Sequence, residues 1–514
     1  MSWRARSFDA LPALSVRGPR LRSALRRVTL AWMFGVVWLS CVSGGHVRIF
    51  ARMLGFNDFA FGLMSAIPFL ATFGQIVASA LIERTGVLKY QFVTCAAVHR
   101  GLWWVIALIP LLLPIPSRAA TAAMLTVLGL SWLTQSLSAP AWMTWMGRLV
   151  PRRIRGRYFA NRARLSMTGQ AVVVIGIGLI MDALYDPAAG DSAAAQPAVL
   201  HVVCAIFALA GVFGLIDILL FRKVPEVLPP APPPAAARAA PRRMGLRRFI
   251  LEPLGDRAFR SYVLYGATIA FSLTVAGWYL WLNAMENLGF SNLATNVLFL
   301  VIAPGAGVLS ARGWGAAIDR WGRRPLLIVA TAGSAVGLLP WFFLSPQAPG
   351  APWTYLAAAA TCLLSGALWT GVTLAETGIV LGFADGNGQS RYVAASAVLI
   401  SAGGALGGLA GGALTQSLAA LRADPVRLGP LALNNWHAAF AVALAARALA
   451  IVWLIGMPEP RALPVRNLVR MMWANAFSNA RTRVFYPLRV FGWRRAARRR
   501  RPGGPQGPPS APGP

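Results

Sequence analysis

The chain has 514 residues, of which 57% are hydrophobic and 13% charged, and its 49 Lys and Arg outnumber its 16 Asp and Glu to give a formal net charge of +33. A soluble chain of this length needs about a quarter charged residues to cover its surface, so the composition excludes a set of soluble domains. The charge does not indicate a nucleic-acid-binding protein either, because long apolar stretches separate the charged segments. These stretches approach the ~20 residues that an α-helix needs to cross a bilayer. The sequence therefore predicts a polytopic membrane protein.

Twelve apolar segments of the sequence are long enough to cross a membrane. Each backbone polar group in lipid needs a hydrogen-bond partner within its own segment, so these segments are predicted to be α-helices. We therefore expect an all-α polytopic membrane protein with twelve transmembrane helices. The expected spans are 29–50, 59–82, 91–114, 120–146, 163–184, 198–221, 261–284, 292–312, 325–345, 353–384, 393–418 and 434–457.

Cationic residues are concentrated in every second connection between the spans. The connections of the other set hold only Arg48, Arg52, Arg118, Arg422 and Arg427. Because short cytoplasmic loops carry an excess of Lys and Arg, this asymmetry predicts that both termini are cytoplasmic. The same charge predicts contact with anionic lipids at the membrane surface.

The two halves of the sequence are related by an internal repeat. Leu54-Gly55-Phe56 recurs 234 residues later as Leu288-Gly289-Phe290, and Arg157-Tyr158 recurs at the same distance as Arg391-Tyr392. Matches at one offset predict two parallel six-helix repeats. The expected organisation is a basic cytoplasmic N-terminal segment 1–28, a six-helix bundle 29–221, a Pro-rich cytoplasmic linker 222–260, a second six-helix bundle 261–457, a basic amphipathic cytoplasmic segment 458–501 and a disordered tail 502–514.

One loop of each half carries a related motif. The second copy reads Gly315-Ala316-Ala317-Ile318-Asp319-Arg320-Trp321-Gly322-Arg323-Arg324-Pro325, and the first reads Ser79-Ala80-Leu81-Ile82-Glu83-Arg84-Thr85-Gly86. With twelve spans and the repeat, this loop resembles the signature of the major facilitator superfamily (MFS) of secondary transporters, Gly-x-x-x-Asp-Arg-x-Gly-Arg-Arg/Lys. The second copy matches at all key positions, whereas the first has Ser79 for the glycine and Glu83 for the aspartate. The resemblance covers roughly residues 29–457. A further run is similar to a pattern in one bacterial branch of the superfamily with unassigned substrate, which implies a bacterial inner membrane; the alternative is a basic helix-connecting loop. This run reads Pro140-Ala141-Trp142-Met143-Thr144-Trp145, then Pro151 and Arg155-Gly156-Arg157-Tyr158-Phe159.

In the superfamily this loop helps to latch the cytoplasmic gate, and the resemblance extends that role to Asp319 and Glu83. A carboxylate such as that of Asp319 can accept hydrogen bonds from the N-terminus of a neighbouring helix, where an anion is favoured. The alternative is purely topological, since basic loops are retained in the cytoplasm. The gating-loop candidates are Glu83, Arg84, Gly86, Gly315, Asp319, Arg320, Gly322, Arg323 and Arg324.

Polar and aromatic residues follow one face of the fourth span and recur at equivalent positions in the tenth. In the superfamily, spans 1, 4, 7 and 10 line the central cavity, where transporters bind their solutes. A single Ser or Thr can instead form a hydrogen bond to the backbone of its own helix. The evidence for a cavity is therefore the pair of stripes and not any one residue. The cavity candidates are Ser40, Ser43, Ser131, Gln135, Ser138, Trp142, Thr268, Ser272, Trp278, Ser365, Trp369, Thr373 and Glu376.

Ionisable residues within spans are costly and usually mark function or an internal pair. Glu376 is the candidate for proton coupling, with a structural hydrogen bond as the alternative. Arg100 could pair with a carboxylate or hold an anion, and a structural role is favoured because span 3 is peripheral in the family. Asp217 and Arg447 are also expected to be structural.

Span 11 contains three glycine pairs, Gly403-Gly404, Gly407-Gly408 and Gly411-Gly412. Glycine at this spacing permits close approach of two helix backbones. In the superfamily this helix lies at the interface between the halves, so the pairs are compatible with sliding of one half against the other. Static close packing of the helices explains the pairs equally well.

The favoured function is secondary active transport of a small organic solute by alternating access, coupled to protons in symport or antiport. The alternatives are a multidrug or metabolite efflux pump, and a non-transporting membrane assembly or receptor protein on the same fold. No nucleophile, metal-ligand spacing or cofactor motif is visible, so no catalytic residue, metal, cofactor or enzyme activity is predicted. The expected partners are the substrate, the membrane and anionic lipids, without nucleic acid, and the expected state is a monomer.

Overall fold

The computed structural model describes residues 10–12, 16–184, 197–228, 252–344, 352–383, 389–429, 431–458 and 470. Residues Met1–Ala462 form one compact unit, which holds all the helices below, and Leu463–Pro514 form a second. Most of the expected Pro-rich linker and C-terminal basic segment, and the whole of the expected tail, lie outside the described residues.

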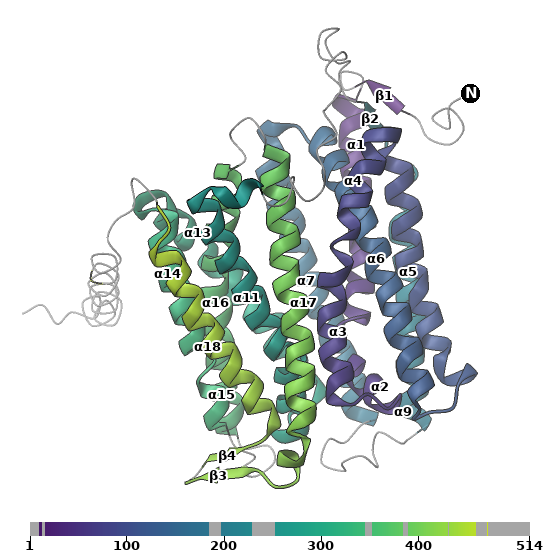
Figure 1. The fold of residues 1–514 in the computed structure, drawn as a ribbon. Helices are drawn as coiled ribbons and strands as arrows, with labels where there is room; N and C mark the ends of the chain where they lie inside the picture. Colours follow the sequence, from purple (N-terminus) through teal and green to yellow (C-terminus); the bar gives the residue numbers. More distant parts are fainter. Residues whose placement is uncertain are drawn as a thin grey trace, which may run out of the picture. The chain divides into compact units, whose positions relative to one another are not determined.

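Twelve helices of the described chain are long and apolar enough to cross a membrane, which confirms the predicted fold class. Several spans consist of two consecutive helical segments, such as α3 and α4 (Figure 1). The π-helical turn η5 continues α11, and the π-helical turn η6 precedes α13. The N-terminal half comprises α1 (Gly18–Cys41), α2 (Gly45–Met53), α3 (Asp58–Ala71), α4 (Gly74–Thr85), α5 (Leu88–Leu112), α6 (Arg118–Leu149), α7 (Arg152–Leu184) and α9 (Pro197–Phe221). The C-terminal half comprises η4 (Glu252–Gly255), α11 (Arg257–Leu282), η5 (Asn283–Asn287), α12 (Asn292–Asn296), η6 (Val297–Ile302), α13 (Ala303–Trp321), α14 (Arg323–Val336), α15 (Pro340–Phe343), α16 (Pro352–Phe383), α17 (Gln389–Ser417), η7 (Ala419–Arg422) and α18 (Asn435–Ile455).

Two short strand pairs lie at opposite ends of the helices. β1 (Ala10–Pro12) pairs in parallel with β2 (Glu226–Leu228), and β3 (Val426–Leu428) forms an antiparallel hairpin with β4 (Leu431–Leu433). We call the end that holds β2, the start of α1 and the α13–α14 connection the basic end. The end that holds α2, the start of α3 and the β3–β4 hairpin is called the distal end.

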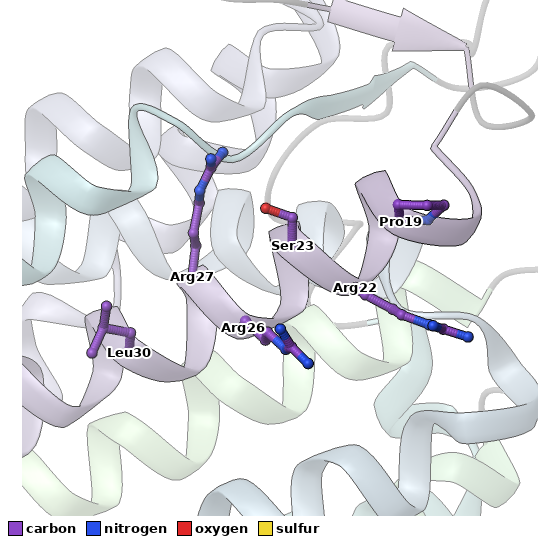
Figure 2. Close-up of a pocket in the computed structure, with 6 residues that line it drawn as sticks. All are labelled: Pro19, Arg22, Ser23, Arg26, Arg27 and Leu30. Atoms are coloured by element: carbon purple, nitrogen blue, oxygen red, sulfur yellow. The ribbon is translucent and has the colours of Figure 1, made fainter.

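The first span differs from its expected range, 29–50. The helix begins at Gly18, with proline in its first turn, and ends at Cys41, before Gly44 takes a φ of 125° that favours glycine. Much of the basic segment 1–28 therefore belongs to this helix. Figure 2 shows Arg22, Arg26 and Arg27 projecting from its first turns. The apolar run in the sequence predicts too late a start for this helix, because in its first turns exposed arginines alternate with buried residues such as Ala24, Val28 and Ala31.

The two halves contact each other through two equivalent helix pairs. α3 of the second span packs along α17 of the eleventh, and α7 of the fifth span packs along α12 and η6 of the eighth. Since the second and eighth spans are repeat equivalents, as are the fifth and eleventh, the two contacts are related by the repeat. Figure 1 shows α3 and α17 side by side.

The glycine pairs of α17 allow this close contact on two faces. A Cβ at Gly404, Gly408 or Gly412 would meet α3, at Phe69, Ala66 and Phe59 respectively. A Cβ at the first glycine of each pair would instead meet the backbone of α11, at residues 267, 271 and 275. Each pair therefore serves one contact within the C-terminal half and one between the halves, as glycine-mediated helix packing allows.

Candidate functional site

A cavity of about 580 Å³ lies within the C-terminal half, between α11, α13, α14 and α16, with α18 behind them. Two of the predicted cavity residues, Ser365 and Trp369 on α16, line it. The cavity size falls in the ~300–1,000 Å³ range of small-molecule sites. Its other lining residues are mostly apolar or aromatic, including Phe299 and Trp341. Such a lining with few polar groups is typical of a site that orients a small solute.

Arg447 of α18 also lines this cavity. Its Nε donates to Ser272 Oγ at 3.1 Å, and its Nη1 donates to the Ser334 carbonyl oxygen at 2.5 Å. Both partners are neutral, and no carboxylate lies within ion-pair distance of Arg447 in the described chain. Sequence reasoning had assigned this residue a structural role, and only the cavity shows that it faces open space.

The predicted polar stripe of α6 makes contacts inside the N-terminal half. Ser131 is buried and lies 2.7 Å from His99 Nδ1 of α5. Ser138 is also buried and donates to the carbonyl oxygen of Gln135 at 2.8 Å. Trp142 is half-buried, and the Arg162 guanidinium lies 5.1 Å from its ring centroid. The stripe thus combines helix packing with one cation–π contact.

The Ser and Thr candidates of the first and seventh spans are engaged with backbone or with α18. Ser40 donates to Val36 O at 2.9 Å, and Ser43 donates to Leu39 O. Thr268 accepts from the indole N–H of Trp453, and Ser272 donates to Ala443 O. These bonds match the helix-packing alternative for the four residues. Trp278 packs instead against a ring of the other half, with 6.2 Å between its centroid and that of Phe61.

Glu376 is half-buried on α16, seven residues before the helix ends at the basic end. It forms no ion pair with another described residue. The hydroxyls of Tyr262 and Tyr265 are near enough to interact with it electrostatically, and Tyr265 is near Arg447 in the same way. Its neighbour Thr373 is exposed and donates to Thr370 O.

Arg100 is paired, as the structural interpretation requires. Its Nη2 lies 3.3 Å from Asp217 Oδ2, and its guanidinium lies 3.5 Å from the ring centroid of Trp38. Both charged residues are buried between α5 and α9. A buried pair of this kind holds two helices in register and leaves no free charge for a solute.

The predicted gating loops lie at the basic end. Asp319 and Arg320 are exposed, and Asp319 makes no hydrogen bond within the described chain. Gly86 and Gly322 end α4 and α13 with φ of 63° and 94°, which explains the glycine at both positions. The side chain of Glu83 lies outside the described residues.

The remaining members of these loops are placed as follows. Arg84 is exposed, Gly315 is half-buried, Arg323 lies against Gly378 of α16, and Arg324 donates to the carbonyl oxygens of Leu454 and Ile455.

A charged cluster joins the two halves at the distal end, and sequence reasoning missed it. Asp58 at the start of α3 is 2% exposed and accepts from Arg52 at 3.1 Å, from Arg422 at 2.5 Å and from Asn435 at 2.6 Å. Glu286 lies 2.8 Å from Arg52 Nε. We call these five residues, with Arg48, the distal cluster. Arg48 Nη2 lies 2.8 Å from Glu286.

Both carboxylates of the distal cluster, those of Asp58 and Glu286, are paired with arginines of the cluster. Burial lowers the pKa of Arg52, but the carboxylates of Glu286 and Asp58 outweigh this effect and raise its pKa above the ordinary value. Arg52 therefore stays charged and bridges the halves. The internal repeat offered a signal, because Arg52 and Glu286 are 234 residues apart and occupy equivalent positions.

Two helix starts are capped across the same interface. The carboxylate of Asp182, near the end of α7, accepts from the backbone N–H of Asn292 at 2.7 Å and of Leu293 at 3.1 Å at the start of α12. At the repeat-equivalent position, Gln416 Oε1 accepts from the N–H of Phe59 at 3.4 Å. Anions and acceptors stabilise helix N-termini, so each cap fastens one half to the other.

No group of three or more His, Cys, Asp or Glu that could hold a metal is found among the described residues. The cysteines Cys41, Cys95, Cys204 and Cys362 are free.

Comparison with solved structures shows the fold. The xylose transporter XylE from E. coli, in an inward open conformation, is 15% identical with a TM-score of 0.58, over 88% of this chain and 99% of that one. A D-xylose-proton symporter is 15% identical with a TM-score of 0.59, over 85% and 98%. The nucleoside transporter NupG is 12% identical with a TM-score of 0.52, over 85% and 98%. No curated protein matches the chain in sequence.

The sequence also matches the family model of the Major Facilitator Superfamily over residues 33–384, which is more than half of the chain. With twelve candidate spans and the fold of solved members, this match settles the family. The chain belongs to the Major Facilitator Superfamily and is an integral membrane transporter of that family, not an enzyme.

Proposed function

We propose that the protein moves a small organic solute across the membrane by alternating access. One observation carries the proposal: every hydrogen bond and ion pair found between described residues of the two halves lies toward the distal end. Asp319 at the basic end has no such partner among the described residues. Described contacts that join the halves toward one end are suited to exchange between two access states. The structural relatives that carry sugars and nucleosides support a small organic solute as cargo.

We further propose that Glu376 couples transport to protons. A carboxyl at this depth without an ion-pair partner in the described chain is costly when ionised. This cost favours a carboxyl that binds a proton, and is therefore neutral, in one of the two access states. Tyr262 and Tyr265 are titratable groups that interact with it electrostatically.

The test is uptake and efflux in proteoliposomes that contain the purified protein, with a broad panel of radiolabelled solutes and with or without a pH gradient. We expect movement of at least one solute, stimulated by the gradient. Glu376→Gln should abolish the stimulation, whereas Asp424→Asn, which removes an exposed carboxylate, should leave it intact. Transport of no solute by the wild type would refute the proposal, and unchanged stimulation in Glu376→Gln would remove the coupling role.

The aromatic cavity favours efflux of apolar compounds as a second candidate function, because Phe299, Trp341 and Trp369 all line it. The same vesicles separate the two candidates. A pump should extrude several unrelated apolar compounds, whereas a solute transporter should select one chemical class.

We propose that the basic end faces the cytoplasm and that its arginines bind anionic lipid. The first turns of α1 line a depression of about 440 Å³ with Arg22, Arg26 and Arg27, and Arg27 donates to Lys223 O at 2.9 Å (Figure 2). Cationic side chains beside an apolar helix are suited to lipid headgroups. Sedimentation with nanodiscs should show that Arg22→Gln/Arg26→Gln reduces the preference of the protein for anionic over zwitterionic lipid, and an unchanged preference would contradict the assignment.

A further inference from the structure

The cavity of the C-terminal half holds an arginine that forms no ion pair with a described carboxylate. Arg447 lies twelve residues into α18, roughly 18 Å along a helix of roughly 31 Å, so it is at membrane depth. An arginine at this depth is costly unless it pairs with another group. Its two protein partners are the neutral oxygens of Ser272 and Ser334.

Two other polar groups of the cavity can donate a hydrogen bond to a ligand. Ser365 Oγ and the indole N–H of Trp369 make no hydrogen bond within the described chain, and both residues line the cavity. None of the residues that line it is acidic. A cavity with one cation, free donors and no carboxylate is complementary to an anion, because a charge-assisted hydrogen bond to a guanidinium is about twice as strong as a neutral one.

The apolar lining of the cavity indicates the chemistry of the remainder of the ligand. Aromatic rings of Phe299, Trp341 and Trp369 surround the space, together with aliphatic residues such as Leu273 and Leu338. An apolar body fits these walls, and a flat ring stacks on them. A fully polar solute such as a free sugar would leave most of its hydroxyls without partners here.

We infer that this cavity binds an amphipathic organic anion, with its carboxylate or phosphate on Arg447 and its aromatic or apolar body against Phe299, Trp341 and Trp369. The inference rests on the proposed function, since it names the class of the transported solute. Ser365 and Trp369 supply the second and third hydrogen bonds to the anion. Tyr265 interacts electrostatically with both Arg447 and Glu376, which links the anion site to the proposed proton site.

The test measures binding, without transport, to the full-length protein in nanodiscs. Isothermal titration calorimetry compares phenylacetate, 3-phenylpropionate and phenyl phosphate with their uncharged counterparts phenylacetamide, 3-phenylpropanamide and phenol. We expect at least one anion to bind about 10-fold or more tightly than its counterpart, as a charge-assisted bond predicts. Equal binding within every pair, or no binding of any anion, would overturn the inference.

Variants locate the site. Arg447→Gln should weaken binding of the anion about 10-fold or more, and Ser365→Ala should weaken it a few-fold. Arg427→Gln, which removes an exposed arginine from the same half, should leave binding unchanged. Full affinity in Arg447→Gln would place the anion elsewhere.

Loss of Arg447 could also disturb folding, because the side chain bonds to α11 and α14. Ser365→Asp therefore provides an independent test that keeps Arg447. Its carboxylate should weaken binding of the anion and leave that of the uncharged counterpart unchanged, and equal effects on both would overturn the assignment.

The outcome for this site is distinguishable from that for the proposed function. A protein that transports an uncharged solute and binds none of the anions removes the site and leaves transport in place. A protein that binds an anion through Arg447 but moves no solute removes the transport proposal and leaves the site.

Discussion

The two ends of the helical unit differ in what joins the halves of the chain. At the distal end, Asp58 and Glu286 meet three arginines across the interface, and Asp182 caps the start of α12. At the basic end, the equivalent type of group, the carboxylate of Asp319 beside Gly322, is exposed. An acidic side chain caps a helix N-terminus across the interface at the distal end, whereas Asp319 at the basic end makes no hydrogen bond with another described residue. We infer that the structure represents the access state that is closed at the distal end.

The largest expected effect follows from loss of the central carboxylate of the distal cluster. Asp58→Ala removes the only acceptor shared by Arg52, Arg422 and Asn435 among the described contacts, and loss of one member of a buried ion cluster costs about 3 kcal/mol. The distal end should then open. In a background without the native cysteines, the pair Phe59→Cys and Gln416→Cys should cross-link efficiently with Asp58 present and poorly in Asp58→Ala.

The exposed residue Asp424 provides the matched control for this experiment. Asp424→Ala removes a nearby carboxylate that has no side-chain partner in the described chain, so cross-linking should be unchanged. Efficient cross-linking in Asp58→Ala would show that the distal cluster does not hold the halves together.

A smaller effect is expected from the glycine contact between α3 and α17. A Cβ at Gly62 would collide with the Cα of Gly412, so Gly62→Ala should destabilise the closed distal end by about 1–3 kcal/mol through overpacking. Gly129→Ala is the control, because nothing lies within 4 Å of its added Cβ. Alanine should there be neutral or stabilise the helix by up to about 1 kcal/mol. Thermal unfolding in detergent measures both, and equal melting temperatures would contradict the close contact.

The two cross-interface caps should differ in strength. Asp182 is charged and bonds two backbone N–H groups, whereas Gln416 is neutral and bonds one at a longer distance. Asp182→Ala should cost about 1 kcal/mol and Gln416→Ala only a few tenths. Hydrogen exchange of the Asn292 and Phe59 amides reports each cap separately. Faster exchange at Phe59 than at Asn292 after the respective substitutions would reverse the expected order.

How far the sequence predicts this molecule depends on the kind of signal. The spans could be predicted because burial in lipid demands long apolar runs, and the start of α1 could not because its arginines alternate with buried alanine and valine. The repeated stripe singles out Ser365 and Trp369 as residues of a central cavity, and the structure places both on the cavity within the C-terminal half. Arg447 could not be predicted to line it, because nothing in its own helix indicates which neighbours leave open space.

The distal cluster escaped sequence reasoning for a different reason. Its charges lie at span ends, where any charge is unremarkable, and the partners that join the two halves are more than two hundred residues apart. The equivalent positions of Arg52 and Glu286 in the repeat are the sequence signal that could have linked these two residues. Ion pairs between halves depend on how the repeats dock, and local pattern does not encode that arrangement.

A last prediction concerns the pH dependence of stability at the distal end, to which His46 and the distal cluster could each contribute. His46 of α2 is fully buried, its Nε2 lies 2.7 Å from Cys41 O, and burial lowers its pKa from 6.5 to about 4. Because the unfolded chain binds a proton that the folded chain excludes, His46 contributes stability that is complete above about pH 6.5 and is lost as the pH falls toward 4. Between pH 7.5 and pH 5 the loss should be about 2 kcal/mol. His46→Gln keeps a donor to Cys41 O and does not titrate, so its thermal stability should vary less over this range than that of the wild type. Parallel pH profiles for the two proteins would assign the acid sensitivity of this end to the distal cluster instead.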